Sequence, residues 1–523
     1  MCLPARNILL QAGMRGDITK RTYDGSRPTG RNHGYPSTDY SPCQRSRKEA
    51  HTRDRPTMNA MGFAGKHITI MGVGFFGGTI GLAKYLVTQG AQVTLTDLKS
   101  AEELRDSVAA LAGLPIRLVL GRHEHADFTD ADLVFASPAV PEASPYLVAA
   151  RAHGVPIDTE MNLFMRLCHG TIVGVTGSNG KTTTTSLIGA ILRAANPRTQ
   201  IGGNIGRSLL PEVAMIEPDD PVVLELSSFQ LEDLAEVGRS PHIALLLNLS
   251  PNHLDRHGNM EAYMAAKMQI FAYQGVNDVA VLNADDPLVR PIVSQVRGQP
   301  RTFSLEHPVD DGAYLDGDRI LITHGRVATE VCHRQDIPLL GHHNVANVLA
   351  AVTATDALGV PPAIARRAIR AFPGVEHRLE FVRELRGVRF YNDSIATSPA
   401  ATLAALAAIR EPIWLIAGGY DKGLSFQTLA EAIVQRVKGV FLIGKTAAEI
   451  AHGIETVRGV ETGSPTISHC HSLQEAVLAA DAVARAGEVV LLSPACASYD
   501  QFRNFVERGR LFKHLVAGLS AYS

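Results

Sequence analysis

Long hydrophobic runs are missing from this sequence, and cysteine and net charge are both scarce. No apolar stretch approaches the roughly 18 residues that a membrane-spanning helix needs, so we expect no membrane partner. The six cysteines among 523 residues are scattered without a C-x-x-C pair, which argues against a disulfide framework or a zinc site and favours a reducing cytoplasm. A formal net charge of −2 gives no reason to expect a nucleic-acid partner.

The first 61 residues contain little that a folded core could bury. They are rich in Arg, Ser, Thr, Pro and Gly, so we predict a disordered extension over 1–61. A transit peptide is one interpretation, but the five acidic residues of this stretch argue against it. We favour an extension upstream of the true start, with translation beginning at Met58 or Met61.

From about residue 62 the chain alternates between short apolar strands and helical segments. The stretch HITIMGVGFFGG places Gly72, Gly74 and Gly77 at a strand-to-helix turn, and Asp97 follows about twenty residues later. This pattern is typical of a dinucleotide-binding oxidoreductase, but glycines at such a turn serve any ligand with a phosphate at a helix N-terminus. We therefore predict a Rossmann-like domain over 62–160 that binds a phosphorylated nucleotide.

A second phosphate-binding pattern, GVTGSNGKTTTT, starts at Gly174. Gly177 and Gly180 give the backbone freedom, Lys181 opens the following helix, and Thr182 can offer its hydroxyl to Mg²⁺. The usual pattern G-x-x-x-x-G-K-[ST] would need a glycine at position 175, where this chain has valine. Because every other part is present in order, we interpret the loop as an intact ATP site with variant glycine spacing.

The variant loop resembles the ATP loop of the Mur ligases and of the related folylpolyglutamate synthases. Nine further motifs follow in the family's order: GGNIG (202–206), ELSSFQLE (225–232), NLSPNHLDRH (248–257), YMAAKMQIF (263–271), GHHNVANVLAA (341–351), EHRLE (376–380), YNDSIATSP (391–399), GGYDKG (418–423) and LLSPACASYDQFRNFVERG (491–509). The resemblance covers roughly residues 62–523, and the last motif argues against a folylpolyglutamate synthase.

The resemblance implies an α/β protein of three domains. Beyond the Rossmann-like domain we expect a central P-loop ATPase domain over 161–373. The alternation of strands and helices then resumes, which predicts a second Rossmann-like domain over 374–523.

The activity that the resemblance implies is ATP-dependent amide-bond formation in peptidoglycan precursor synthesis. ATP would phosphorylate the alanyl carboxylate of UDP-N-acetylmuramoyl-L-alanine, and the amine of D-glutamate would then displace phosphate from the acyl phosphate. Four alternatives stay open: L-glutamate as the acceptor, a folylpolyglutamate synthase-like ligase, a dinucleotide-dependent oxidoreductase, and a nucleotide-binding regulator without catalysis. We expect a monomer.

The resemblance also assigns residues to ATP and Mg²⁺. The expected ATP-binding residues are Gly177, Ser178, Asn179, Gly180, Lys181, Thr182, Thr183, Asn347, Arg378 and Asp393. The expected metal ligands are Thr182, Glu225, His253 and Lys267, the last as a carbamylated lysine. Among these, Lys181, His253 and Lys267 are the expected catalytic residues. Carbamylation needs an uncharged amine, which favours a lysine whose pKa is lowered by burial or by cationic neighbours.

Two further substrate sites follow from the same resemblance. The expected UDP-sugar contacts are Gly74, Asp97, Ser137, Asn204, Ser227 and Gln230, and the expected glutamate contacts are Thr397, Lys422, Ser498 and Phe505. A dicarboxylate acceptor needs two separate anion sites, and the second set supplies them. One departure matters, because Ile395 stands where many relatives have a lysine, and this puts the handling of the acceptor in doubt.

Overall fold

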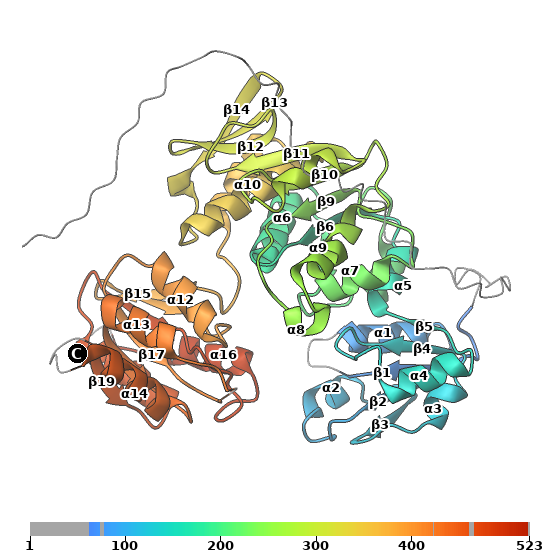
Figure 1. The fold of residues 1–523 in the computed structure, drawn as a ribbon, viewed down its shortest axis with the longest axis horizontal. Helices are drawn as coiled ribbons and strands as arrows, with labels where there is room; N and C mark the ends of the chain where they lie inside the picture. The colour runs from blue at the N-terminus through green and yellow to red at the C-terminus, as the bar shows by residue number, and fades with distance from the viewer. Residues whose placement is uncertain (1–61, 74–77, 422, 460–464, 521–523) are drawn as a thin grey trace, which may run out of the picture. The chain divides into compact units, whose positions relative to one another are not determined.

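A computed structural model of the chain describes residues 62–73, 78–421, 423–459 and 465–520. The predicted extension over 1–61, Gly74, Gly77 and Lys422 lie outside these residues. The described chain forms three β-sheets with five, nine and six strands, each flanked by helices, which confirms the predicted α/β class (Figure 1). No helix of the described residues is both long enough and apolar enough to cross a membrane.

The first sheet is parallel throughout, with strand order β3-β2-β1-β4-β5. Its strands are β1 (His67–Met71), β2 (Gln92–Asp97), β3 (Ile116–Leu120), β4 (Leu133–Ala136) and β5 (Ile157–Asp158). Its helices are α1 (Gly78–Thr88), α2 (Arg105–Ala110), α3 (Ala126–Thr129) and α4 (Pro145–Ala152). The strand order reverses between β1 and β4, and ligands of such sheets bind in the crevice at this reversal, outside the carboxyl ends of the strands.

The central sheet has the order β14-β13-β12-β11-β10-β9-β6-β8-β7. Its strands are β6 (Thr171–Thr176), β7 (Gln200–Gly203), β8 (Pro221–Glu225), β9 (Ile243–Leu246), β10 (Val279–Asn283), β11 (Gln299–Ser304), β12 (Asp311–Asp316), β13 (Arg319–His324) and β14 (Val327–His333). The strands from β7 to β12 in this order are parallel, whereas β12, β13 and β14 form an antiparallel meander.

The helices of the central part are α5 (Glu160–Leu167), α6 (Lys181–Ala195), α7 (Ser228–Leu234), α8 (Leu254–His257), α9 (Met260–Met268), α10 (His342–Asp356) and α11 (Pro362–Ala371). Helix α6 and helix α10 share one core with strands β6 and β9, in which Val173, Leu187, Leu245 and Val348 are fully buried. This packing brings the N-terminus of α6 to the edge of the sheet where the parallel strands end (Figure 1).

The third sheet has the order β15-β16-β20-β17-β18-β19. Its strands are β15 (Glu380–Leu385), β16 (Val388–Asn392), β17 (Ile413–Ala417), β18 (Val437–Leu442), β19 (Thr466–His469) and β20 (Val489–Leu492), and all but β15 are parallel. Its helices are α12 (Pro399–Ala408), α13 (Gln427–Arg436), α14 (Ala447–Arg458), α15 (Leu473–Val483) and α16 (Phe505–Ala517).

Strand β17 is apolar at every position because both faces of the third sheet are covered. Ile413 and Leu415 belong to one core cluster, whereas Trp414 and Ile416 belong to another on the opposite face. Successive side chains of a strand point to opposite faces, so a parallel strand buried on both sides has no polar alternation.

Candidate active site

The phosphate loop joins β6 to α6, and the structure explains its variant spacing. Val175 is a fully buried strand residue that pairs with Glu225 of β8 and Leu245 of β9, so no glycine is needed there. The left-handed backbone comes later, at Gly180 with φ of 82°. A side chain at Gly180 would also overlap the amide oxygen of Asn347, so glycine is required there on two counts.

Lys181 is the first residue of α6, and its side chain folds back over the loop. Its ammonium donates to the carbonyl oxygens of Gly177 at 2.9 Å and Ser178 at 3.1 Å. Burial lowers the pKa of Lys181, and the carboxylate of Glu225 opposes that shift. A cation above the N-terminus of a 15-residue helix suits the phosphates of a nucleotide.

Asn248 fixes the loop from below, and the sequence had not marked it as a site residue. Its side-chain oxygen accepts from the Asn179 amide N–H at 2.8 Å, and its side-chain nitrogen donates to the Asn179 carbonyl at 3.0 Å. Its own carbonyl accepts from the Ser178 N–H at 3.0 Å. Three hydrogen bonds from one residue therefore hold the turn. Its position at the start of the NLSPNHLDRH motif was the available signal.

Glu225 ends strand β8 as a buried carboxylate, 2% exposed, beside the loop. Its Oε1 accepts from the Asn204 side chain at 2.9 Å, and its Oε2 has no hydrogen-bond partner among the described residues. A buried, unpartnered carboxylate oxygen is costly unless a cation completes it. Together with the Thr182 hydroxyl, which lines the same cavity, this oxygen fits Mg²⁺, which prefers oxygen ligands.

Lys267 of α9 reaches the same loop from the opposite side. Its ammonium is 1% exposed as a residue and donates to the Gly177 carbonyl at 3.0 Å and the Thr176 hydroxyl at 3.3 Å. Burial, with the positive charge of Lys181 nearby, lowers the pKa of the Lys267 amine to about 7. The chemical condition for carbamylation, a substantially neutral amine, is therefore met.

His253 is exposed at the N-terminus of α8, in the left-handed region with φ of 53°. Its ring packs edge-on against Phe229 of α7 at 5.1 Å between centroids. The same phenylalanine stacks on His257 at 5.3 Å and lies 4.0 Å from the guanidinium of Arg256. Phe229 is thus the packing centre of the turn that presents His253.

Asn347 of α10 lies directly against the start of α6. Its side-chain oxygen accepts from the Thr184 hydroxyl at 3.2 Å, and its nitrogen donates to Asn344 at 2.9 Å. Thr183 is buried beside it at the helix start. The predicted adenine contact is therefore fixed in place by neighbours.

Asp393 and Arg378 belong to the third part of the chain. The Asp393 carboxylate accepts from the Leu379 N–H at 3.1 Å and the Ser493 hydroxyl at 2.8 Å. Burial raises the pKa of this carboxyl to about 6. Arg378 is exposed in the segment before β15.

The predicted UDP-sugar residues fall into two groups. In the first sheet, the Asp97 carboxylate accepts from the Val73 N–H at 2.8 Å, and Ser137 follows β4 so closely that a side chain at Gly72 would come within 3.0 Å of it. Both stand at the carboxyl ends of strands next to the order reversal. In the central part, Ser227 and Gln230 form the capping box of α7, so both side chains have local partners.

The predicted glutamate residues lie on loops at the carboxyl ends of the third sheet. Thr397 follows β16, Ser498 follows β20 and is 2% exposed, and Phe505 begins α16. Ile395, whose backbone N–H donates to the His377 carbonyl, stands among them as an apolar residue.

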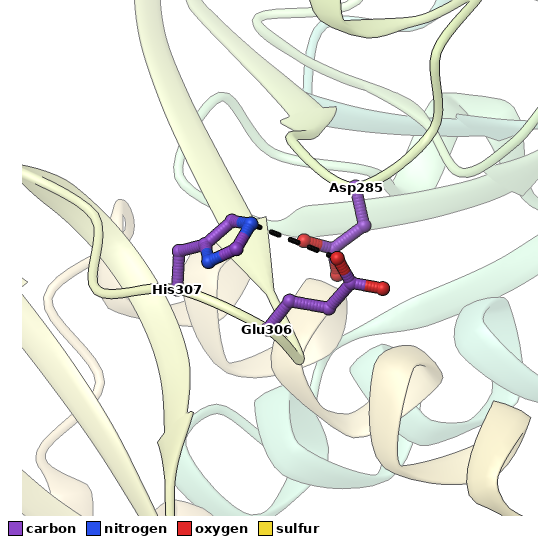
Figure 2. Close-up of side chains that lie close together, drawn as sticks. All are labelled: Asp285, Glu306 and His307. Atoms are coloured by element: carbon purple, nitrogen blue, oxygen red, sulfur yellow. Dashed lines mark ion pairs between the residues drawn. The ribbon is translucent and has the colours of Figure 1, made fainter.

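A second group of potential metal ligands lies on the loops after β10 and β11. Figure 2 shows the carboxylates of Asp285 and Glu306 facing the imidazole of His307. The Asp285 oxygens already accept from the Ser304 hydroxyl at 2.5 Å and the Leu305 N–H at 2.7 Å. The side chains of Glu306 and His307 are two-thirds exposed and pair at 3.6 Å, which is typical of a surface ion pair.

The fold and the site define an α/β nucleotide-binding protein with an ATP loop between two further sheet domains. Family models match the Mur ligase MurD-like N-terminal domain over residues 66–158, the Mur ligase middle domain over 175–355, and the Mur ligase glutamate ligase domain over 377–496. The chain belongs to the Mur ligase family, whose members are ATP-dependent amide ligases that use Mg²⁺.

Curated relatives extend this match over almost their whole length. The chain is 47% identical to the UDP-N-acetylmuramoylalanine–D-glutamate ligase of Roseiflexus sp. (strain RS-1) over 467 residues, which are 87% of this chain and 99% of that protein. It is 46% identical to the protein of the same name from Symbiobacterium thermophilum, over 86% of this chain and 98% of that one. Among solved structures, the UDP-N-acetylmuramate-alanine ligase MurC of Thermotoga maritima shares the fold, with a TM-score of 0.58 at 21% identity over 86% of this chain and 99% of that one.

Proposed function

We propose that this protein joins D-glutamate to UDP-N-acetylmuramoyl-L-alanine at the expense of ATP, in peptidoglycan precursor synthesis. The observation that carries the proposal is the convergence of Lys181, Lys267 and the unpartnered Glu225 oxygen on one phosphate loop. The relatives, 40–47% identical and named for this reaction, support the choice of substrates.

The first step transfers the γ-phosphoryl group of ATP to the alanyl carboxylate, and ADP leaves. Two anions must meet, so the protein has to supply positive charge that is already in position. Lys181 lies above the loop and is suited to the β- and γ-phosphates. Bound Mg²⁺ would neutralise the charge that develops on the phosphoryl oxygens, held by Thr182 and Glu225.

Lys267 is the proposed second metal ligand after carbamylation, together with His253. A neutral amine adds to CO₂, the N–C bond forms and one proton leaves, which converts a cation into an anion. The pKa of about 7 leaves roughly half of the amine neutral at pH 7. In its carbamylated form Lys267 no longer opposes the positive charge of Lys181.

The second step is attack of the glutamate amine on the acyl phosphate, with loss of phosphate. Thr397 and Lys422 are the proposed contacts of the α-carboxylate, and Ser498 with the Phe505 backbone those of the γ-carboxylate. We further propose that the three parts divide as 62–160, 161–373 and 374–523, that the first part holds the UDP group at Asp97 and Ser137, and that the protein acts as a monomer.

Phosphate release from ATP tests this function directly. We expect release that requires both UDP-N-acetylmuramoyl-L-alanine and D-glutamate, with L-glutamate at least tenfold poorer in kcat/KM. A preference for L-glutamate would overturn the choice of acceptor, which Ile395 makes worth measuring. Release with a folate acceptor, or turnover that changes NADH absorbance, would contradict the proposed function as a whole.

A further inference from the structure

Three loops carry the proposed acceptor residues, and they leave three adjacent strands. Strands β16, β20 and β17 are neighbours in the third sheet, so their carboxyl ends meet at one edge. The loop after β16 leads through Ser394 to Thr397, the loop after β20 leads through Ala497 to Ser498, and the loop after β17 contains Gly419. A dicarboxylate can be held only if these loops keep fixed distances from one another.

One buried arginine contacts all three loops. Arg508 of α16 donates from Nε to the Ser394 hydroxyl at 3.0 Å and from Nη2 to the Ser394 carbonyl at 2.9 Å. It also donates to the carbonyls of Cys496 at 3.1 Å and Ala497 at 3.4 Å. On the third loop, a side chain at Gly419 would stand 3.3 Å from its Nη1.

Direct contacts between the loops complete the arrangement around this guanidinium. The Tyr420 N–H donates to the Ala497 carbonyl at 2.8 Å, which joins the second and third loops. The Ser394 hydroxyl donates to the Phe505 carbonyl at 2.7 Å, which joins the first loop to the start of α16. Arg508 and Phe505 therefore reach the loops from one helix.

The charge of Arg508 is unusual for its position. The residue is 1% exposed, and no ion pair with a carboxylate is formed within the part of the chain that the structure describes. Its acceptors are neutral oxygens, and burial lowers the pKa of the guanidinium to about 10. A buried cation without a counter-ion is costly, so packing alone gives no reason to keep an arginine here.

We propose that Arg508 is the positioning residue of the acceptor site: its guanidinium fixes the loops that bind the amino dicarboxylate and places a positive charge behind them. The inference rests on the proposed function. The charge stands next to the Ile395 loop, where this chain has no lysine. A planar fork with several donors can satisfy diverging carbonyls, whereas the single ammonium of lysine cannot.

Steady-state kinetics of Arg508→Lys test the proposal, because lysine keeps the charge and loses the fork. Charge-assisted hydrogen bonds contribute roughly 1.5–3 kcal/mol, so we expect kcat/KM for glutamate to fall about ten- to a hundredfold. The KM values for ATP and for UDP-N-acetylmuramoyl-L-alanine should change less than about twofold, as should acyl phosphate formation, measured without glutamate by borohydride trapping. Arg510→Lys, an exposed arginine on the same helix, is the matched control and should behave as the unmodified protein.

Two further variants keep the test decisive if Arg508→Lys lowers stability. Ser394→Ala removes one acceptor of the guanidinium, and we expect it to raise the glutamate KM about three- to tenfold with an unchanged ATP KM. Ethylguanidinium should restore part of the glutamate affinity lost in Arg508→Ala. Equal losses for all three substrates, or an unchanged glutamate KM in Arg508→Lys and Ser394→Ala, would overturn the proposal. A failure of the proposed function would look different, because the unmodified protein would then release no phosphate with glutamate.

Discussion

At the scale of single residues, the active site is organised by charges held away from water. Lys181 and Lys267 both donate to the Gly177 carbonyl, so two ammonium groups approach one oxygen. Like charges at this distance disfavour each other, and burial weakens both, so the pKa of each lysine is lowered. Such an arrangement is stable only when one of the two amines gives up its proton or gains a negative group.

The carbamate on Lys267 gives the first prediction at this scale. The neutral fraction of an amine with a pKa of about 7 rises from about a tenth at pH 6 to about nine tenths at pH 8. We therefore expect ¹³C-bicarbonate to label Lys267 increasingly over this range, as a carbamate signal in ¹³C NMR. Lys267→Ala should lose the signal and nearly all ligation, with ATP affinity within about threefold.

Short carboxylic acids should restore part of the ligation in Lys267→Ala by supplying the missing anion. Two results would contradict the assignment: a carbamate signal that persists in Lys267→Ala, or loss of ATP binding in that variant. The second would mean that Lys267 holds the nucleotide, a role that the structure gives to Lys181.

The sequence predicted residue types at this scale better than it predicted partners. Motif order placed Lys181, Glu225 and Lys267 in one site, and the structure brings them together around the loop. It could not show that Asn204 bonds to Glu225, because a contact across 21 residues depends on which strands are neighbours. For the same reason Asn248 and Arg508, both inside quoted motifs, had no role before the structure was described.

At the scale of elements, helices α7 and α8 form one unit around Phe229. Its ring contacts the rings of His253 and His257 and the guanidinium of Arg256, so an apolar side chain orders a turn of polar residues. His253 has a left-handed backbone, which costs energy for a residue other than glycine and needs support from packing.

We predict that Phe229→Leu weakens metal binding while ATP binding without metal is retained. Aromatic and cation–π contacts contribute ~1–2 kcal/mol together, so the Mg²⁺ concentration for half-maximal rate should rise roughly 5- to 30-fold. Mn²⁺ titration followed by EPR measures the affinity independently of turnover. Phe229→Tyr keeps the ring and serves as the control. An equal effect of both variants would show that the ring does not position His253.

Element prediction succeeded where periodicity was local. The strand-loop-helix unit from β6 to α6 was expected within one residue of its observed bounds, because an apolar run and a glycine-rich turn lie next to each other in sequence. The meander of β12, β13 and β14 was not predicted. Its strands carry exposed polar residues, and the shift in register between Ile320 and Leu321 interrupts the pairing of β13 with β14.

At the scale of the whole molecule, the matched length argues that the ligase lies within the part that follows the first 61 residues. The Roseiflexus relative is matched over 99% of its own length by 87% of this chain, and the first family model begins at residue 66. Everything that a protein of this family contains is therefore present after the extension.

We predict that a chain beginning at Met58 ligates as well as the full chain. All residues assigned to ATP, metal, UDP-sugar and glutamate have higher numbers, so kcat/KM for each substrate should agree within about twofold. The measurement is parallel kinetics of the two chains, with thermal unfolding as the control. Lost activity at an unchanged unfolding temperature would give the first 57 residues a functional role.

The close approach of Asn347 to Gly180 limits how this protein can change under selection. Every codon change that replaces Gly180 adds at least one carbon atom, which would overlap the Asn347 amide and occupy a backbone conformation that side chains rarely adopt. A viable replacement therefore requires a second, simultaneous mutation at Asn347, which also bonds to Thr184. Paired mutations arise far less often than single ones, so a compound that competes with ATP at this corner would meet few escape routes.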